Sequence, residues 1–434
     1  MRFVSPVALG LMLAVGGMAF GVSVPSAVAK EKKDGGAPKL KLSKGFLQPV
    51  QKLNDAIVKK DVAAAKAAMP AAQAAIASND DKYQYYALML NLSIEAQDAA
   101  MQGEALKGML DTGLVPASQQ GQFNSIVAGN EMAAKNYDAA MAYAEKAKAA
   151  GASPADINPV LAQVIWAKAG DDKTQVARGL ALFKEGIDSM KAAGKPVPAQ
   201  WYQVGVSKAA AANLPQLGEW ARMAYKAEPS GENLRTVLRV FQREHPTMTN
   251  RENLDLLRLM NVSGGLALKP DYLEYAEMAF KGGIFGEVKS AIDKGRAEGV
   301  LGSTDGSENY SVASQRISSD KGSLASAAAD AAKSSTGKIA SATADAYLGY
   351  GDYAKAVELY KLALQKGSVD AAEVNTRLGI AEAMSGDAAA AKADLAKVTG
   401  GARGGIAQMW IDYLDSKAPA SAAAPAAAEA QPAA

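Results

Sequence analysis

The stretch ADAYLGYGDYAKAVELYKLA, residues 344–363, holds two helix-forming segments separated by the turn signal Gly351-Asp352. Small residues at Ala344 and Ala356 allow two helices to approach closely. Tyr347 and Tyr360 fill the volume left between the helical turns. The stretch therefore predicts a helical hairpin that buries one face.

Similar turn signals recur along the chain, at successive gaps of roughly 31 to 42 residues or about twice that. They are Lys60-Asp61, Asn136-Tyr137, Asp171-Asp172, Asn213-Leu214, Gly283, Asp320, Gly351-Asp352 and Gly386-Asp387. No convincing alternating strand pattern lies between them. Since a single hairpin would expose its apolar side, stability must accumulate through neighbouring hairpins. We expect an all-α solenoid of about ten hairpins, covered at its end by an amphipathic helix at 406–414.

The hairpin at 338–370 resembles a tetratricopeptide repeat (TPR), because Tyr347, the turn at Gly351-Asp352, and then Ala356, Tyr360 and Ala363 follow the spacing of that family. The next unit, 371–403, matches through Leu378-Gly379, Gly386-Asp387, Ala391, Leu395 and Val398, although Glu382 stands where the family usually has Tyr. A third match begins at Trp201 and Val204-Gly205. The resemblance implies a TPR-like solenoid that works as a binding or scaffolding module.

The composition excludes several classes of protein. The chain has 434 residues, 47 Lys and Arg against 45 Asp and Glu, no Cys and one His. The net charge is close to neutral, so the protein lacks the basic surface expected of a nucleic-acid binder. A single His and no Cys exclude His- and Cys-based metal clusters, and no Gly-rich phosphate loop is present, so we expect no cofactor.

The N-terminal 29 residues predict export. Met1-Arg2 supplies a short positive segment, 7–20 an apolar stretch, and Ala27 and Ala29 a small-residue cleavage site before Lys30. An uncleaved anchor is the alternative, but glycines and Pro25 interrupt the apolar run. We expect a signal peptide at 1–29, a linker at 30–45, the solenoid at 46–416 and an Ala/Pro-rich disordered tail at 417–434. The mature protein would be soluble in the periplasm, without a membrane span.

The polar and aromatic clusters have mostly structural interpretations. His245 precedes Pro246, which disfavours helix, and is expected in a loop. Asp80-Asp81 and Asp171-Asp172 lie at predicted turns, where Asp caps helices or bonds the local backbone. Tyr83 and Tyr86 share a helix face and should pack in the core, whereas Tyr85 is the candidate for exposure. The segment 302–343 has few large apolar residues and predicts a weak hairpin.

The inward-facing positions of the two best repeats are the candidate binding site. The family pattern places Lys338, Asp345 and Glu373 on the first helices, facing one groove, with Arg377 at its edge. Solvated helix-face charges are the alternative interpretation. We expect a non-enzymatic scaffold or adaptor that binds a protein or peptide in the cell envelope. The alternative function is a protein acting on cell-wall or other polysaccharide, with a carboxylate site inside the superhelix.

Overall fold

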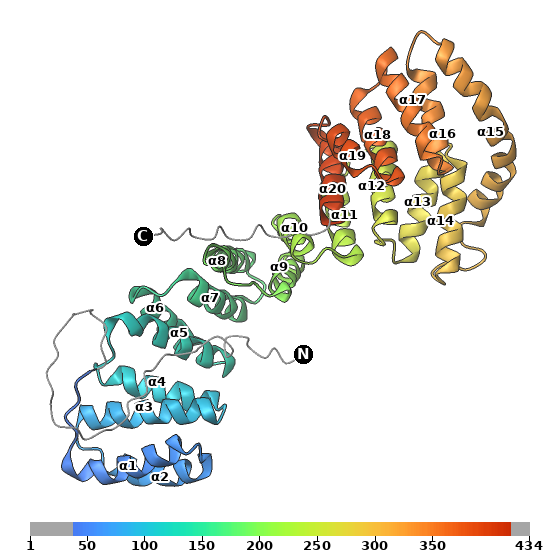
Figure 1. The fold of residues 1–434 in the computed structure, drawn as a ribbon. Helices are drawn as coiled ribbons and strands as arrows, with labels where there is room; N and C mark the ends of the chain where they lie inside the picture. The colour runs from blue at the N-terminus through green and yellow to red at the C-terminus, as the bar shows by residue number, and fades with distance from the viewer. Residues whose placement is uncertain (1–37, 418–434) are drawn as a thin grey trace, which may run out of the picture. The chain divides into compact units, whose positions relative to one another are not determined.

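The computed structural model describes residues 38–417. All regular structure in that range is helical, with twenty α-helices and no strand (Figure 1). This confirms the all-α fold class, and twenty helices fit the ten hairpins predicted from the spacing. The proposed signal peptide, its cleavage site at Ala27, Ala29 and Lys30, and the tail from Ala418 onward lie outside the described residues.

The described chain divides into two compact units, and we treat each separately. Residues 38–198 and 207–214 form the N-terminal unit, and residues 199–206 and 215–417 form the C-terminal unit. The boundary runs through one helix, α9 (Ala199–Ala211).

The N-terminal unit consists of four helical hairpins in chain order. Its helices are α1 (Lys44–Val58), α2 (Val62–Ala74), α3 (Asn79–Glu95), α4 (Ala99–Asp111), α5 (Ala117–Ala133), α6 (Tyr137–Ala149), α7 (Pro154–Ala169) and α8 (Lys173–Ala192). Each helix packs on the next, and the closest pairs are α1 with α2, α3 with α4, α5 with α6 and α7 with α8. This is the packing of a helical repeat array.

The C-terminal unit contains the remaining helices. They are α10 (Leu217–Ala227), α11 (Gly231–Glu244), α12 (Asn250–Val262), α13 (Lys269–Lys281), α14 (Phe285–Ala297), α15 (Ser307–Lys333), α16 (Lys338–Gly349), α17 (Tyr353–Lys366), α18 (Ala371–Ser385), α19 (Ala388–Leu395) and α20 (Gly401–Lys417). The two sequence stretches that best match the TPR pattern form the hairpins α16–α17 and α18–α19. Ala344, Ala356 and Ala391 are fully buried at these contacts, as their small size predicts.

Several hairpin turns share one local device. The residue just before the N-cap of the second helix has a left-handed backbone conformation. Its φ is 57° at Lys60, 52° at Gln97, 80° at Gly351 and 93° at Gly386. The Asp that follows then accepts a hydrogen bond of 2.9–3.2 Å from the backbone N–H three residues on. These capping residues are Asp61, Asp98, Asp352 and Asp387. The turn signals in the sequence thus specify both the end of one helix and the start of the next.

The segment 302–343 does not form the expected hairpin. Residues 307–333 form the single 27-residue helix α15, and Asp320, expected at a turn, lies inside it. No left-handed residue precedes Asp320, so nothing ends the helix there. The low apolar content has the expected consequence for packing, since α15 buries only Ala313, Leu324 and Ala331.

Helix α20 closes the C-terminal unit on itself. It packs against α18 and α19, as the expected covering helix should, and also against α12, which lies far away in sequence (Figure 1). The indole N–H of Trp410 donates to the main-chain oxygen of Asp255 over 3.2 Å. The Tyr413 hydroxyl donates to the main-chain oxygen of Val262, also over 3.2 Å. The covering helix therefore joins the end of the unit to its early part.

Candidate functional site

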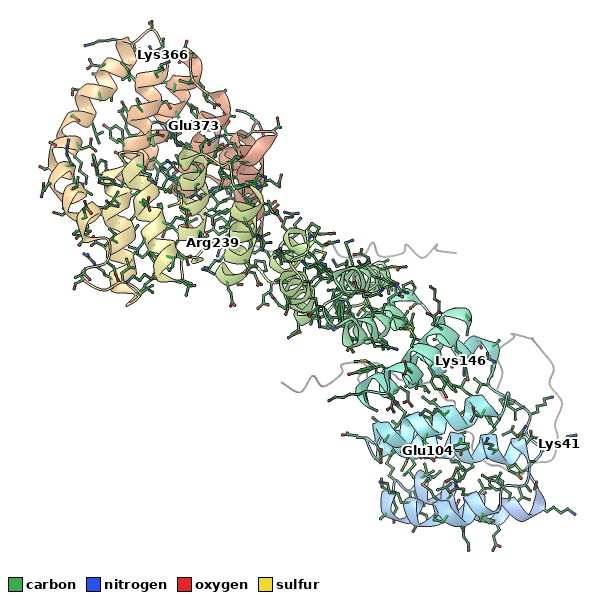
Figure 2. The ribbon with its side chains drawn as sticks, turned by 180° about the vertical axis from the view of Figure 1, so that it is seen from behind. Lys41, Glu104, Lys146, Arg239, Lys366 and Glu373 are labelled. Carbon is green, nitrogen blue, oxygen red and sulfur yellow. The ribbon has the colours of Figure 1, made fainter. Side chains whose placement is uncertain are left out.

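Three of the four candidate groove residues meet in one cluster inside the C-terminal unit. The guanidinium of Arg377 lies 2.7 Å from a carboxylate oxygen of Asp345 and 2.6 Å from one of Glu373, a residue labelled in Figure 2. Arg377 is only 2% exposed and Asp345 7%. Lys338 is exposed and has no ion pair within the described chain. The cluster is therefore buried, where the sequence analysis expects charges facing an open groove.

Asp255 on α12 is the centre of the same cluster, and sequence reasoning missed it. Its carboxylate is fully buried and lies 2.7 Å from Arg258, 3.2 Å from Arg377 and 2.8 Å from Arg403. Arg258 also bonds Glu287 on α14 at 2.7 Å. These ion pairs tie together helices α12, α14, α16, α18 and α20. We call the set Asp255, Arg258, Glu287, Asp345, Glu373, Arg377 and Arg403 the buried ion network.

The electrostatics of the network are those of a structural clamp. Burial alone would raise the pKa of Asp255, but Arg377, Arg258 and Arg403 outweigh it and hold the pKa below its usual value. Burial and the neighbouring Asp345 carboxylate raise the pKa of Tyr360, whose hydroxyl donates to Asp345 over 2.6 Å. Because the carboxylates of the network already accept bonds from guanidinium groups, they are poorly placed to act as free acid or base.

A second carboxylate cluster lies within the hairpin α18–α19. Glu382, at the position where the TPR pattern usually has Tyr, is 2% exposed and faces Asp394. Lys361 lies 2.9 Å from Glu382, and Lys397 bonds Asp394. Burial and then the Asp394 carboxylate raise the pKa of Glu382. Neither carboxylate lines one of the two cavities described below.

Replacing Glu382 with Gln should stabilise the protein more at pH 8 than at pH 4.5. A carboxyl whose folded pKa is raised favours the folded state less as the pH climbs from the unfolded value, near 4.3, through the folded one. Gln keeps the shape and loses this ionisation. Thermal melts at both pH values measure the difference. Glu358→Gln on α17 is the control. It removes a largely exposed carboxylate that pairs with Lys355 at 2.7 Å, so it should give no gain in stability at pH 8. An equal shift for Glu382→Gln would contradict the assignment.

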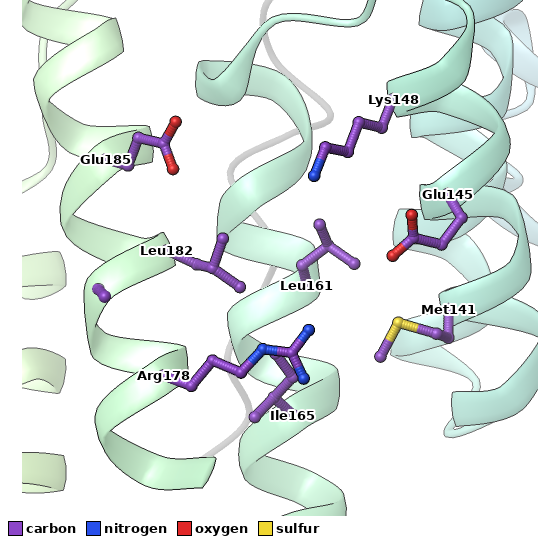
Figure 3. Close-up of a pocket in the computed structure, with 9 residues that line it drawn as sticks. Met141, Glu145, Lys148, Leu161, Ile165, Arg178, Leu182 and Glu185 are labelled. Carbon is purple, nitrogen blue, oxygen red and sulfur yellow. The ribbon is translucent and has the colours of Figure 1, made fainter. Parts of the chain in front are cut away.

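A pocket in the N-terminal unit joins α6, α7 and α8 (Figure 3). Leu161 and Ile165 of α7 form its floor, and Met141 and Leu182 add apolar surface from the two flanking helices. Its volume is about 250 Å³. That is below the roughly 300–1,000 Å³ of pockets for small-molecule ligands, so it fits a side chain better than a free ligand.

Charged side chains of both signs surround this apolar floor. Glu145 and Lys148 extend from α6, and Arg178 and Glu185 from α8 (Figure 3). Glu185 accepts a hydrogen bond from Asn158 over 2.9 Å. Within residues 38–417, Glu145, Lys148 and Arg178 make no ion pair or side-chain hydrogen bond. The pocket combines an apolar centre with a charged rim, most of whose side chains have no ion-pair or hydrogen-bond partner in the described chain.

The sequence holds a local signal for this pocket. Met141, Glu145 and Lys148 are spaced i, i+4, i+7 on α6, and Arg178, Leu182 and Glu185 have the same spacing on α8. Both helices are the second of their hairpins. The TPR pattern places a groove on the first helices, so residues of second helices were not among the candidates.

The remaining candidates have structural roles. Asp81 accepts backbone N–H bonds from Ser43 and Ala77, and Asp172 caps α8, as predicted for turn aspartates. His245 ends α11 and its ring stacks on Phe241. Tyr85, expected to be exposed, is only 2% exposed. The expectation was wrong because α3 packs against α1, α2 and α4 and buries residues on several faces.

Between residues 38 and 417, no helix is both long and apolar enough to cross a membrane. In the same range, no group of three or more His, Asp or Glu side chains is arranged to hold a metal ion. Comparison of the chain with protein-family models gives no match, and comparison with curated proteins gives none either.

Proposed function

We propose that this protein is a TPR-like scaffold that binds another protein or a peptide in the bacterial cell envelope and catalyses no reaction. The α6–α8 pocket, with its apolar floor and unpaired charges of both signs, carries the proposal. Protein interfaces typically combine an apolar centre with a polar rim, and most binding energy comes from a few anchors seated in pockets.

The charges at the rim of the pocket favour a partner segment with a matching arrangement of charged side chains. Lys148 and Arg178 can pair with acidic groups, and Glu145 with a basic one, without first breaking bonds inside the protein. The partner segment would place one bulky apolar side chain on Leu161 and Ile165, flanked by charges of both signs. Such complementarity favours specificity and fast association.

The sequence supports the envelope location and the family. The N-terminal residues have the pattern of a cleavable signal peptide. Its removal would leave a periplasmic protein that begins at Lys30. Close helix contacts at the small positions Ala356 and Gly379 agree with the TPR pattern. The enzymatic alternative gains no comparable support. A larger cavity in the C-terminal unit is lined by the carboxylates Glu287 and Asp293, and each of them pairs with a cation.

Site-specific photo-crosslinking in cells tests the proposal. A photoreactive residue at Ala181, an exposed position lining the pocket, should capture a discrete partner, whereas one at Ala192, exposed on the same helix but outside the pocket, should not. Lys148→Glu should then weaken the crosslink, because it reverses a rim charge. Lys146→Glu on the same helix is the matched control and should leave it unchanged.

The opposite pattern would reject the pocket as a partner site. Crosslinks that are equal at Ala181 and Ala192, or that are indifferent to Lys148→Glu in a folded protein, would show that the captured protein does not sit on the α6–α8 pocket. Circular dichroism melts of each variant provide the folding control.

A further inference from the structure

The C-terminal unit contains a larger cavity of about 840 Å³, which the proposed scaffold function does not use. Its volume falls within the roughly 300–1,000 Å³ of pockets for small-molecule ligands. Buried residues form its inner end, among them Arg258, Tyr275 and Trp410. Exposed ones, including Ser290 and Lys321, stand at its mouth. The cavity is thus closed at one end by the core and open to solvent at the other.

The inner end of the cavity has no spare charge. The guanidinium of Arg258 is saturated by Glu287 at 2.7 Å and Asp255 at 2.7 Å. The Tyr275 hydroxyl donates to Glu287 over 3.2 Å. Around these paired groups, the walls are apolar or aromatic. They include Val262, Leu348, Tyr353, Ile380 and Met384. A ligand group at this depth is favoured if it is uncharged and largely apolar, since the charged groups there, Arg258 and Glu287, already pair with each other.

The wider part of the cavity has excess positive charge. Apart from the paired groups of the inner end, three lysines line the cavity, Lys289, Lys294 and Lys321, against one carboxylate, Asp293. Lys289 pairs with Asp293. Lys294 donates to the side-chain oxygen of Asn261 over 2.8 Å, and its nearest carboxylate, Glu298, lies 4.0 Å away. Lys321 lies over the Tyr350 ring at 4.8 Å and has no carboxylate partner in the described chain.

We propose that this cavity binds a small amphiphilic anion. Its aliphatic or aromatic body would occupy the apolar inner end, and its anionic head group would lie at Lys321. Lys294 also lines the cavity. An unbranched Met384 and several aromatic rings can adapt to bodies of different shape. An anion at Lys321 gains a charge-assisted bond without breaking an existing ion pair.

Calorimetric titration of the mature chain with decanoate tests this site. Decanoate should bind one per chain. Decanoyl-N-methylglucamide, which has the same acyl chain and an uncharged head group, should bind at least about tenfold more weakly, because it cannot pair with a lysine. Absence of saturable decanoate binding, or equal affinity for both probes, would overturn the proposal.

Two variants locate the bound anion. Lys321→Glu should weaken decanoate binding at least about tenfold, whereas Lys333→Glu, an exposed lysine of the same helix outside the cavity, should not. Ser290→Trp places a bulky ring at the mouth of the cavity while keeping every charge, and should weaken decanoate binding at least about tenfold. Unchanged affinity in folded Lys321→Glu or Ser290→Trp would place the ligand elsewhere and reject the site.

The outcome is separable from that of the scaffold proposal. Lys148→Glu alters only the α6–α8 pocket and should bind decanoate like the unmodified protein. Lys321→Glu should in turn leave the crosslink at Ala181 intact. Loss of both properties in either variant would contradict the assignment of two distinct sites.

Discussion

Replacing Asp255 with Ala should destabilise the C-terminal unit by about 3 to 5 kcal/mol, the cost of breaking a buried ion pair by removing one partner. Asp255 is fully buried and accepts bonds from Arg258, Arg377 and Arg403. Its removal takes a buried partner from each of these guanidinium groups. Arg258 keeps Glu287 and Arg377 keeps Asp345, but Arg403 is left with Glu373 at 3.9 Å. A loss of this size is a large fraction of the roughly 5–15 kcal/mol that stabilises an ordinary domain.

Urea unfolding followed by tryptophan fluorescence measures the effect. In a Trp166→Phe background, the remaining tryptophans, at 201, 220 and 410, all belong to the C-terminal unit. Asp415→Ala is the matched control, because Asp415 is 58% exposed and pairs only with Lys392 at the surface. It should cost no more than about 1 kcal/mol. Similar losses for the two variants would show that the buried ion network is not a clamp.

Because the pKa of Asp255 is lowered, the stability of the C-terminal unit should also depend on pH in the acid range. A carboxyl with a depressed folded pKa contributes stability that is present above its unfolded value, near 3.9, and is lost as the pH falls through the folded value. The unmodified protein should therefore lose this contribution only below about pH 4. Asp255→Ala should lack that part of the acid transition.

The hairpin turns could be predicted from the sequence because their causes are local. A left-handed residue followed by a capping Asp fits within a few positions, as at Lys60-Asp61 and Gly386-Asp387. The same reasoning failed at Asp320, where the aspartate is present but the left-handed residue is not. A turn signal needs both parts, and Asp320 supplies only one of them.

The buried ion network could be predicted only in part, because half of it depends on tertiary contacts. The helical register brings Asp345, Glu373 and Arg377 together on neighbouring helices, and the structure places them in contact. Asp255 lies 122 residues from Arg377 in the sequence, and the two meet where α20 packs against both α12 and α18. No local sequence pattern predicts the contact between α20 and α12. The charges are therefore expected from the sequence to be solvated, although the structure buries them.

Glycines that face aromatic rings are a recurrent feature of the helix contacts, and Gly205 in α9 is the tightest. A Cβ added to Gly205 would lie 1.9 Å from the ring of Trp220, which is among the largest fully buried side chains. Gly108 faces Tyr86 and Gly179 faces Trp166 in the same way. The Val204-Gly205 position, which resembles the TPR pattern, is therefore required to be small by a specific ring.

Gly205→Ala should consequently destabilise the C-terminal unit, although Ala is the better helix former. The overpacking cost of about 1–3 kcal/mol or more exceeds the gain of about 0.5–1 kcal/mol in helix propensity. Gly322→Ala, inside α15 with no atom near the added methyl group, should show that gain alone and raise stability. Both variants are measured by urea unfolding in the Trp166→Phe background. If both substitutions stabilised the unit, the ring of Trp220 would have to move away at little cost. Close packing of that ring would then not be what requires glycine at position 205.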